Sequence, residues 1–393
     1  MYNIFKKHRR WRLVCAILSL SLLTVMAGAA VAPALGLIQE HFSNTDKGLV
    51  QMIVSMPALF IAGTNLLLFK PLCKWIKART LLIIGLLLYV VFGCAAGLFG
   101  NIVLILICRA MVGVGVGIIM PLSTGLLSFY FTRDKQAPLM GYSSALNMMG
   151  GVVATLIAGG LAMISWRMSF LVYLLGLISI LLCLKWMPNE RIYDDRQKAR
   201  QGIQALKYLP YICVMFVLSF TFFVYPASFA LECTKSGAIP QSLIAPVMAM
   251  MDIFGFAGGF MFSYISKKIM AAAKYIAPLL FAMAYICLGV MGGVIGILAG
   301  SALVGLANGI GVPFVMTSAS AKAGKDAAAT VMPLLSAALY LAQFITPMLL
   351  SFVSGITGVN VYITAIGSSI LLLILSALCG NRRIDGGDKQ ECD

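Results

Sequence analysis

The sequence predicts an all-α polytopic membrane protein with twelve transmembrane helices. Three observations lead to this prediction. The 393-residue chain is 61% hydrophobic with a mean hydropathy of +0.97, whereas soluble domains are about 45–50% apolar. Only 11% of its residues are charged, compared with about 25% in soluble domains. The apolar residues also gather in runs of about 20, the length that crosses a bilayer as a helix.

Twelve such runs follow one another along the chain. They are Leu13–Leu37, Gly48–Phe69, Thr80–Phe99, Ile102–Ser123, Ala137–Ile164, Met168–Met187, Tyr208–Leu231, Gln241–Ile265, Tyr275–Val294, Ile295–Ser318, Ala327–Ser354 and Val359–Cys379. The first run follows a basic segment, as in a signal peptide. It is longer than the roughly 7–15-residue apolar core of a signal peptide, so we expect it to be a retained first helix.

The basic residues indicate how the spans are oriented. With the N-terminus inside, alternation of the twelve spans leaves 25 of the 29 Lys and Arg residues on the cytoplasmic side. The exceptions are Lys47, Arg167 and Lys235 outside, and Arg109 within a span. Positive residues stay on the cytoplasmic side, so we expect both the N- and C-termini to be cytoplasmic. This clustering also accounts for the net charge of +16 without a nucleic-acid partner.

The longest polar stretch divides the chain into two related parts. We expect an N-terminal six-helix bundle (residues 1–187), a cytoplasmic connector (residues 188–206) and a C-terminal six-helix bundle (residues 207–393). Sliding the sequence by 192 residues superimposes two sets of positions. Val112, Gly113, Gly117 and Pro121 fall on Val304, Gly305, Gly309 and Pro313. Parallel six-helix repeats are typical of one large class of secondary transporters.

Four passages match the motifs of a known family. The loop after the second run has Pro71, Leu72 and Arg79 in places of the pattern G-P-L-x-D-R-x-G-R-R, with Lys74 where the pattern has Asp. The fourth run matches R-x-x-q-G-x-G at Arg109, Gly113 and Gly115.

The fifth run has Gly151, Gly159 and Gly160 at the spacing of the antiporter pattern G-x-x-x-G-P-x-x-G-G. The sixth run begins with Trp166-Arg167, as in the pattern W-R-x-x-F. On these residues the chain resembles the major facilitator superfamily over nearly its whole length. The resemblance implies that family's fold of two pseudo-symmetric six-helix bundles, and secondary active transport by alternating access.

Two charged residues inside the membrane are the first candidates for function, because charge at that depth is rare and usually functional. Asp252 is the one carboxylate near the middle of a run. Desolvation favours its protonated form, so it could carry a proton between the two sides, or contact the substrate. Arg109 keeps its charge and needs a partner. We expect it to line the cavity or to bridge helices, and the two residues could meet across the cavity in one state.

Six polar residues inside the runs could line a substrate cavity. They are Asn65, Asn147, Asn308, Tyr340, Gln343 and Tyr225. Each could equally tie two helices together, as polar residues in membrane helices often do. Tyr225 precedes Pro226, and the pair could form a bend near the outer gate.

Two functions remain open at this point. One is proton-coupled export of hydrophobic or amphipathic small molecules, similar to the drug-efflux branch of the family. The alternative is a proton-coupled carrier of a small organic anion or metabolite, with Arg109 contacting the anion. A channel would need a continuous polar lining, which two deep charges do not supply. The glycines of Gly113–Gly117 lie inside a membrane run with no strand before it, which argues against a phosphate-binding loop and an enzyme.

The remaining expectations concern partners and location. Ten scattered cysteines and two histidines give no metal-ligand spacing, so we expect no metal or cofactor, with a proton gradient as the energy source. We expect a small-molecule substrate, membrane lipids as surroundings, no nucleic acid and a monomer. The short loops favour a bacterial inner (plasma) membrane.

Overall fold

The computed structural model describes residues 2–68, 71–72, 75–131, 133–189, 208–268, 270–291, 293–358 and 360–380. Lys70 and Lys74 of the loop motif, and nearly all of the expected connector at residues 188–206, lie outside these residues. All regular elements in the described part of the chain are helices.

The α-helices are α1 (Tyr2–Ala29), α2 (Leu35–His41), α3 (Lys47–Gly63), α5 (Ala78–Ala95), α6 (Ile102–Tyr130), α7 (Arg133–Ala162), α8 (Gly176–Trp186), α9 (Leu209–Ser236), α10 (Gln241–Lys268), α11 (Met270–Ile286), α12 (Gly293–Thr357) and α13 (Val361–Gly380). The shorter elements are the 3-10 helices η1 (Ala32–Ala34) and η3 (Trp166–Leu175) and the π-helical segments η2 (Thr64–Leu68) and η5 (Cys287–Met291).

Among the described residues, twelve helical segments are long and apolar enough to cross a membrane, which confirms the predicted number. They are Trp11–His41, Lys47–Leu67, Ala78–Ala95, Ile102–Leu127, Ala145–Ala162, Trp166–Trp186, Leu209–Ser236, Gln241–Phe262, Lys274–Met291, Gly293–Ser320, Val331–Ile356 and Val361–Leu378. A helix satisfies its own backbone hydrogen bonds, which is what the interior of a bilayer requires.

The single apolar run Leu13–Leu37 predicted one regular helix for the first span. The structure instead breaks this span into two helices. α1 ends at Ala29, and a 3-10 turn containing Pro33 joins it to α2. Proline has no backbone N–H, and its ring clashes with the carbonyl one turn earlier, so a regular helix cannot run through it unchanged. Pro33 is buried, which brings this turn into the interior of the molecule.

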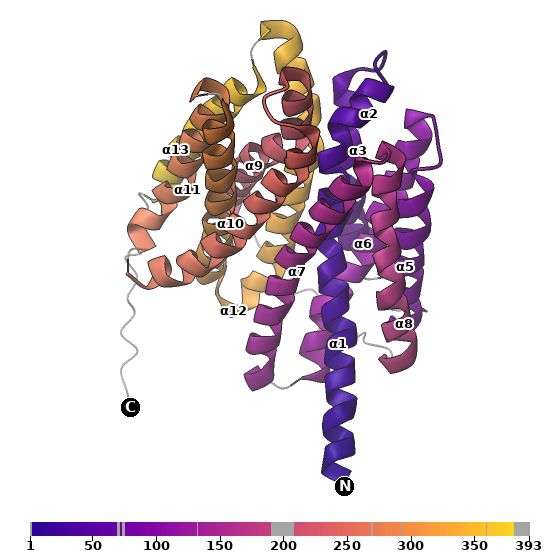
Figure 1. The fold of residues 1–393 in the computed structure, drawn as a ribbon. Helices are drawn as coiled ribbons and strands as arrows, with labels where there is room; N and C mark the ends of the chain where they lie inside the picture. The colour runs from indigo at the N-terminus through magenta and orange to yellow at the C-terminus, as the bar shows by residue number, and fades with distance from the viewer. Residues whose placement is uncertain are drawn as a thin grey trace, which may run out of the picture.

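α12 holds two of the predicted spans in one uninterrupted helical run, where the sequence predicted two helices with a break after Ser318. The run has 65 residues, and a straight helix of that length would extend about 100 Å, three times the ~30 Å hydrocarbon core. In Figure 1 its chain turns back near the label α12. The segment between the spans contains Ala321, Ala323 and Ala327–Ala329, and alanine is the strongest helix former.

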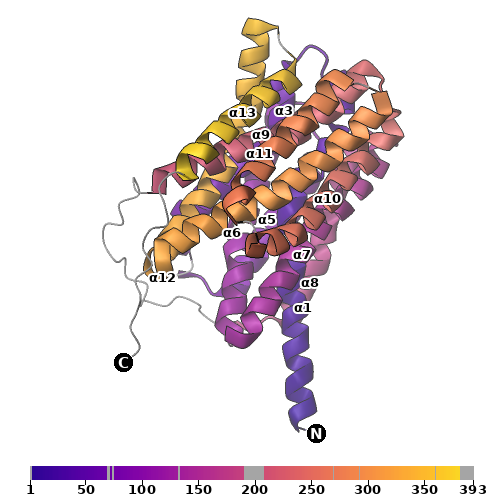
Figure 2. The same cartoon turned by 90° about the vertical axis from the view of Figure 1, so that its left-hand side faces the viewer.

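The helices form two groups that lie side by side. α1 to α8 pack mainly on one another, and α9 to α13 do the same, as the purple and orange parts of Figure 1 show. The groups touch where α3 meets α12, α7 meets α10 and α2 meets α9. In both views α1 projects beyond the other helices at its N-terminal end (Figure 2).

Candidate functional site

Asp252 lies on α10 at the contact with α7, which belongs to the other group of helices. A Cβ atom added to Gly151 of α7 would stand 3.1 Å from Oδ2 of Asp252 and 3.3 Å from its Cγ. The same atom would stand 3.1 Å from Cγ1 of Val25 on α1. The space beside residue 151 is therefore filled by the carboxyl group, which reaches from the second group of helices to the surface of the first.

A second glycine of α7 continues this contact. A Cβ atom at Gly159 would collide with the Cβ atom of Ala245 on α10 and would stand 3.8 Å from Cβ of Pro33. Residue numbers rise along α7 from 151 to 159 while their neighbours on α10 fall from 252 to 245, so the two helices run antiparallel. Gly160 has no atom within 4 Å of an added Cβ. Of the three motif glycines, Gly151 and Gly159 therefore make the contact with α10.

The glycines that follow Asp252 pack on another helix. Gly258 would place a Cβ atom 3.2 Å from the Cα of Gly309 on α12, and Gly255 faces the carbonyl of Gly305 at 3.5 Å. Small residues let helix backbones approach closely. The partner of α10 at these glycines is the first span of α12, so α10 is held closely on one side while Asp252 faces α7.

Arg109 on α6 is completely buried and bridges helices. Its Nε donates to the carbonyl of Ile53 on α3 at 2.6 Å, and its two Nη groups donate to the carbonyl of Ala27 on α1 and to the hydroxyl of Tyr173 in η3. The Tyr173 hydroxyl in turn donates to the Ala27 carbonyl at 3.0 Å. The planar fork of guanidinium donors suits several acceptors at once, so one side chain joins four helical elements.

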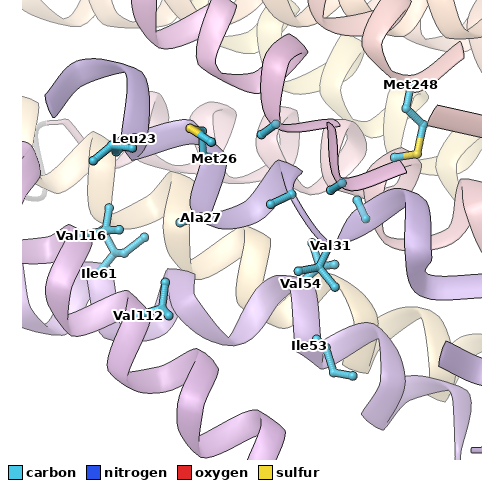
Figure 3. Packing of buried hydrophobic residues seen from close by; sticks show 14 of the residues in the cluster. Leu23, Met26, Ala27, Val31, Ile53, Val54, Ile61, Val112, Val116 and Met248 are labelled. Carbon is cyan, nitrogen blue, oxygen red and sulfur yellow. The ribbon is translucent and has the colours of Figure 1, made fainter. Parts of the chain in front are cut away.

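The surroundings of Arg109 are apolar. Ala27 and Ile53 belong to the buried hydrophobic cluster, together with Val112 and Val116 of α6 (Figure 3). All described hydrogen-bond partners of Arg109 lie in the first group of helices, and all are neutral. Asp252 lies against Gly151 of α7 and is not among these partners, so the structure does not pair Arg109 with Asp252.

The glycines that follow Arg109 are packing positions. An added Cβ atom at Gly113 would stand 2.9 Å from Cβ of Phe60 on α3, and one at Gly115 would stand 3.3 Å from Cβ of Leu88 on α5. α6 is thus fitted closely between α3 and α5. This arrangement holds the Arg109 side chain against the carbonyl of Ile53.

Two of the predicted cavity residues reach from α12 to the first group of helices. The Tyr340 hydroxyl donates to Sδ of Met120 on α6 at 3.0 Å. Nε2 of Gln343, one turn further along α12, stands 3.3 Å from the position of a Cβ atom at Gly28 on α1. Both residues therefore lie, like Asp252, at the boundary between the two groups.

The other predicted residues differ in their surroundings. Tyr225 is buried within the second group, where its hydroxyl donates to Ser301 at 2.7 Å and its ring stacks on Phe229. Asn65 lies in η2 and Asn308 in α12, both partly buried. Asn147 lies on α7, and its Oδ1 is buried without a hydrogen-bond partner in the described part of the chain.

Polar contacts that the sequence analysis missed join the two groups near α2. Nε2 of Gln51 on α3 donates to the hydroxyl of Ser228 on α9 at 3.1 Å. Asp46 caps α3 by accepting from the backbone N–H of Gly48 at 3.0 Å, and also accepts from Ser351 of α12 at 3.4 Å. A signal for Gln51 was present, because a buried amide inside an apolar run needs a partner.

Trp166 and Arg167 stabilise the end of the molecule at which α2 lies. The guanidinium of Arg167 lies 4.8 Å from the centre of the Trp166 ring and donates to the carbonyl of Leu98 at 3.2 Å. A hollow of about 440 Å³ opens beside Trp166, with Glu40 and His41 at its rim. Both rim residues are exposed, so the hollow belongs to the molecular surface and not to the contact that holds Asp252.

Comparison with known proteins identifies the family. The Major Facilitator Superfamily model matches residues 17–347. An uncharacterized transporter of Schizosaccharomyces pombe is 24% identical over 51% of this chain and 42% of its own length. The quinolone resistance protein NorA of Staphylococcus aureus is 27% identical over 42% of this chain and 40% of its own. The chain thus spans less than half of the length of the curated relatives it matches.

Solved structures match a larger part of the chain than these relatives do. The nucleoside transporter NupG superposes with a TM-score of 0.74 at 13% identity, covering 94% of this chain and all of that one. An inward-facing bacterial homologue of the human lysosomal transporter Spinster superposes with a TM-score of 0.69 at 15% identity, covering 95% of this chain and 94% of that one. At such identities the likeness concerns the fold. The twelve described helical segments that can cross a membrane indicate a multi-pass membrane protein, and the family match points to a transporter rather than an enzyme: the chain belongs to the Major Facilitator Superfamily.

Proposed function

We propose that the protein is a proton-coupled exporter of hydrophobic and amphipathic small molecules that works by alternating access. In this proposal Asp252 carries the proton. Its carboxyl group gains a proton from water on one side of the membrane, and this O–H bond breaks again when the site opens to the other side. A bound cationic molecule displaces the proton, which makes the protein an antiporter.

The observation that carries the proposal is the position of Asp252 between α10 and α7. An ionised carboxylate in an apolar bundle is unfavourable unless it is paired or hydrated. Protonation or a cationic substrate removes this penalty, so either one lets the two groups of helices close around the residue. On α7 the carboxyl group lies against Gly151, which offers no competing charge.

The environment of Arg109 argues against the alternative of an anion carrier. Its guanidinium is fully buried and donates to Ala27, Ile53 and Tyr173. An anionic substrate would have to displace these acceptors and would take the guanidinium donor from the buried carbonyl of Ile53, at about 1–3 kcal/mol. The partial similarity to the quinolone resistance protein NorA also favours export.

The proposal includes a location and an organisation. The distribution of Lys and Arg supports cytoplasmic termini, in the inner (plasma) membrane of a bacterium. The functional unit is a monomer surrounded by lipid that binds a small-molecule substrate and no nucleic acid. Residues 1–187 and 207–393 form the two moving bundles, with residues 188–206 as the connector between them.

The test is transport by the full-length protein in proteoliposomes with an acidic lumen, measured as accumulation of ethidium, a lipophilic cation. We expect uptake by the wild type that stops when an ionophore collapses the pH gradient. Asp252→Asn should lose this uptake with reconstitution unchanged, because an amide cannot exchange the proton.

Asp46→Asn is the matched control, since Asn also caps helices well and Asp46 lies at the start of α3. It should retain uptake. Gradient-driven uptake by Asp252→Asn at the wild-type rate would refute Asp252 as the proton carrier. Uptake of an organic anion by the wild type, with none of ethidium, would favour the carrier alternative.

A further inference from the structure

Asn147 has an unsatisfied hydrogen-bond acceptor inside the protein. Its Oδ1 is buried and has no partner in the described part of the chain. One turn earlier on α7, the hydroxyl of Ser143 is paired with that of Ser21 at 2.6 Å. A buried polar atom without a partner is unfavourable, and in native structures it calls for an explanation.

The unsatisfied atom lies one turn of α7 from the place where Asp252 meets that helix. Asn147 and Gly151 are four residues apart, so they are neighbours on the same face. The carboxyl group of Asp252 fills the space beside Gly151, with Oδ2 3.1 Å from the position of a Cβ atom there. The amide of Asn147 and the carboxyl group of Asp252 therefore lie at neighbouring turns of the same side of α7.

The chemistry of the two groups makes such a contact depend on protonation. An ionised carboxylate only accepts hydrogen bonds, and so does an amide oxygen. A protonated carboxyl group has one O–H donor. The amide oxygen of Asn147 therefore repels the ionised form of Asp252 and pairs with the protonated form.

We propose that Asn147 is a positioning residue that recognises the protonated state of Asp252 by accepting a hydrogen bond from its O–H group. This inference rests on the proposed function in one respect, that Asp252 exchanges a proton during transport. The hydrogen bond joins α7 to α10 when the proton is bound and is lost when the proton leaves. Proton binding thereby changes how strongly the two groups of helices adhere, and a ligand shifts a two-state equilibrium only through such a difference.

The other described groups around Asp252 do not accept a hydrogen bond from its O–H group. Tyr225 of α9 is within electrostatic reach of Asp252, but its hydroxyl donates to Ser301, which donates to the carbonyl of Ile297. On α1, the uncharged Val25 lies beside the same glycine, Gly151. α12 presents Gly305 and Gly309 to α10.

The test titrates Asp252 directly. N,N′-dicyclohexylcarbodiimide reacts with protonated carboxyl groups in apolar surroundings, and mass spectrometry of the purified full-length protein measures labelling of Asp252 against pH. Asn147→Leu has a similar shape but no acceptor. It should lower the midpoint pH of labelling by about half to one unit, because removing a membrane hydrogen bond weakens proton binding about threefold to tenfold.

Asn147→Gln retains the carbonyl oxygen and should shift the midpoint less than Asn147→Leu does. Asn65→Leu, the same change in η2, should leave the midpoint in place. A midpoint that is unchanged in Asn147→Leu overturns the inference. A raised midpoint overturns it too, because it would mean that the amide N–H groups of Asn147 stabilise the ionised form of Asp252. Wild-type ethidium uptake tests the proposed function separately, so an unchanged midpoint beside intact uptake would refute the role of Asn147 alone.

Discussion

Asp252 and Gly151 face each other across the contact between α10 and α7, with 3.1 Å between the carboxylate Oδ2 and the place of a Cβ atom at residue 151. The pair joins Asp252, which the sequence places near the middle of an apolar run, to a glycine of the antiporter pattern. Because the glycine makes room for the carboxyl group, the size of residue 151 should control the position of Asp252.

Gly151→Val tests this relationship. The added side chain would occupy the space of the Asp252 carboxyl group and of Val25, so Asp252 must turn away from α7. We expect ethidium uptake driven by a pH gradient to fall at least about tenfold, which corresponds to ~1.4 kcal/mol, with normal amounts of protein in the membrane.

Gly160→Val is the control for this change, because the same helix offers open space at residue 160. Its uptake should stay within about twofold of the wild type, a difference below ~0.5 kcal/mol. Equal losses in the two variants would show that α7 is sensitive to any larger side chain, and the pairing of Gly151 with Asp252 would then explain nothing.

Arg109→Lys should destabilise the protein although it keeps the charge. A lysine ammonium cannot match the fork of donors that serves Ala27, Ile53 and Tyr173. Loss of one hydrogen bond to a charged group weakens a fold by about 1.5–3 kcal/mol. We expect a lower midpoint of thermal unfolding in detergent, by several degrees.

Arg167→Lys is the comparison, since Arg167 lies at the end of the molecule and is only partly buried; its midpoint should change little. An unfolding midpoint that stays constant in Arg109→Lys, together with lost binding of an organic anion, would assign Arg109 to the substrate and revive the anion-carrier alternative.

Gln51 and Ser228 should separate during the transport cycle, because their hydrogen bond joins α3 to α9 across the two groups. Cysteines at these two positions, bridged by a short bifunctional thiol reagent, are expected to stop ethidium uptake. Cleaving the bridge with a reductant should restore it. The single-cysteine variants, treated in the same way, should keep transporting, and continued transport by the bridged protein would mean that this contact does not open.

The orientation of the spans is open to a direct measurement. Lys47 is the first residue of α3 and Lys77 directly precedes α5, and both are exposed. The distribution of basic residues predicts that a cysteine at residue 77 reacts with a membrane-impermeant maleimide only from the cytoplasmic side. A cysteine at residue 47 should react only from the outside, and labelling of both from one side would exclude the predicted alternation.

Much of the fold could be predicted because membrane spans are local features. Twenty apolar residues in a row form a helix in lipid whatever surrounds them, so the twelve spans and the two deep charges were evident in the sequence. The joined spans of α12 were not, because Lys322, Lys325 and Asp326 interrupt the apolar run while the alanines around them favour a helix.

The sequence predicted the candidate residues of the site but not the partners that they contact. Asp252, Arg109 and Asn147 stand out as polar residues in apolar runs, which identifies them as candidates. Their partners do not stand out: Arg109 binds backbone carbonyls of Ala27 and Ile53, and every residue has a carbonyl. Gln51 and Ser228 lie in spans from different halves of the sequence, and nothing in either span points to the other.

The sequence by itself determined that this protein lies in a membrane, how many times it crosses, and which side chains could act there, because these follow from the hydropathy of short segments. Only the tertiary structure decided that Arg109 joins helices and that Asp252 faces Gly151 and has Asn147 one turn away. Such contacts depend on how helices distant in the sequence are rotated and packed, and hydropathy carries no information about that rotation.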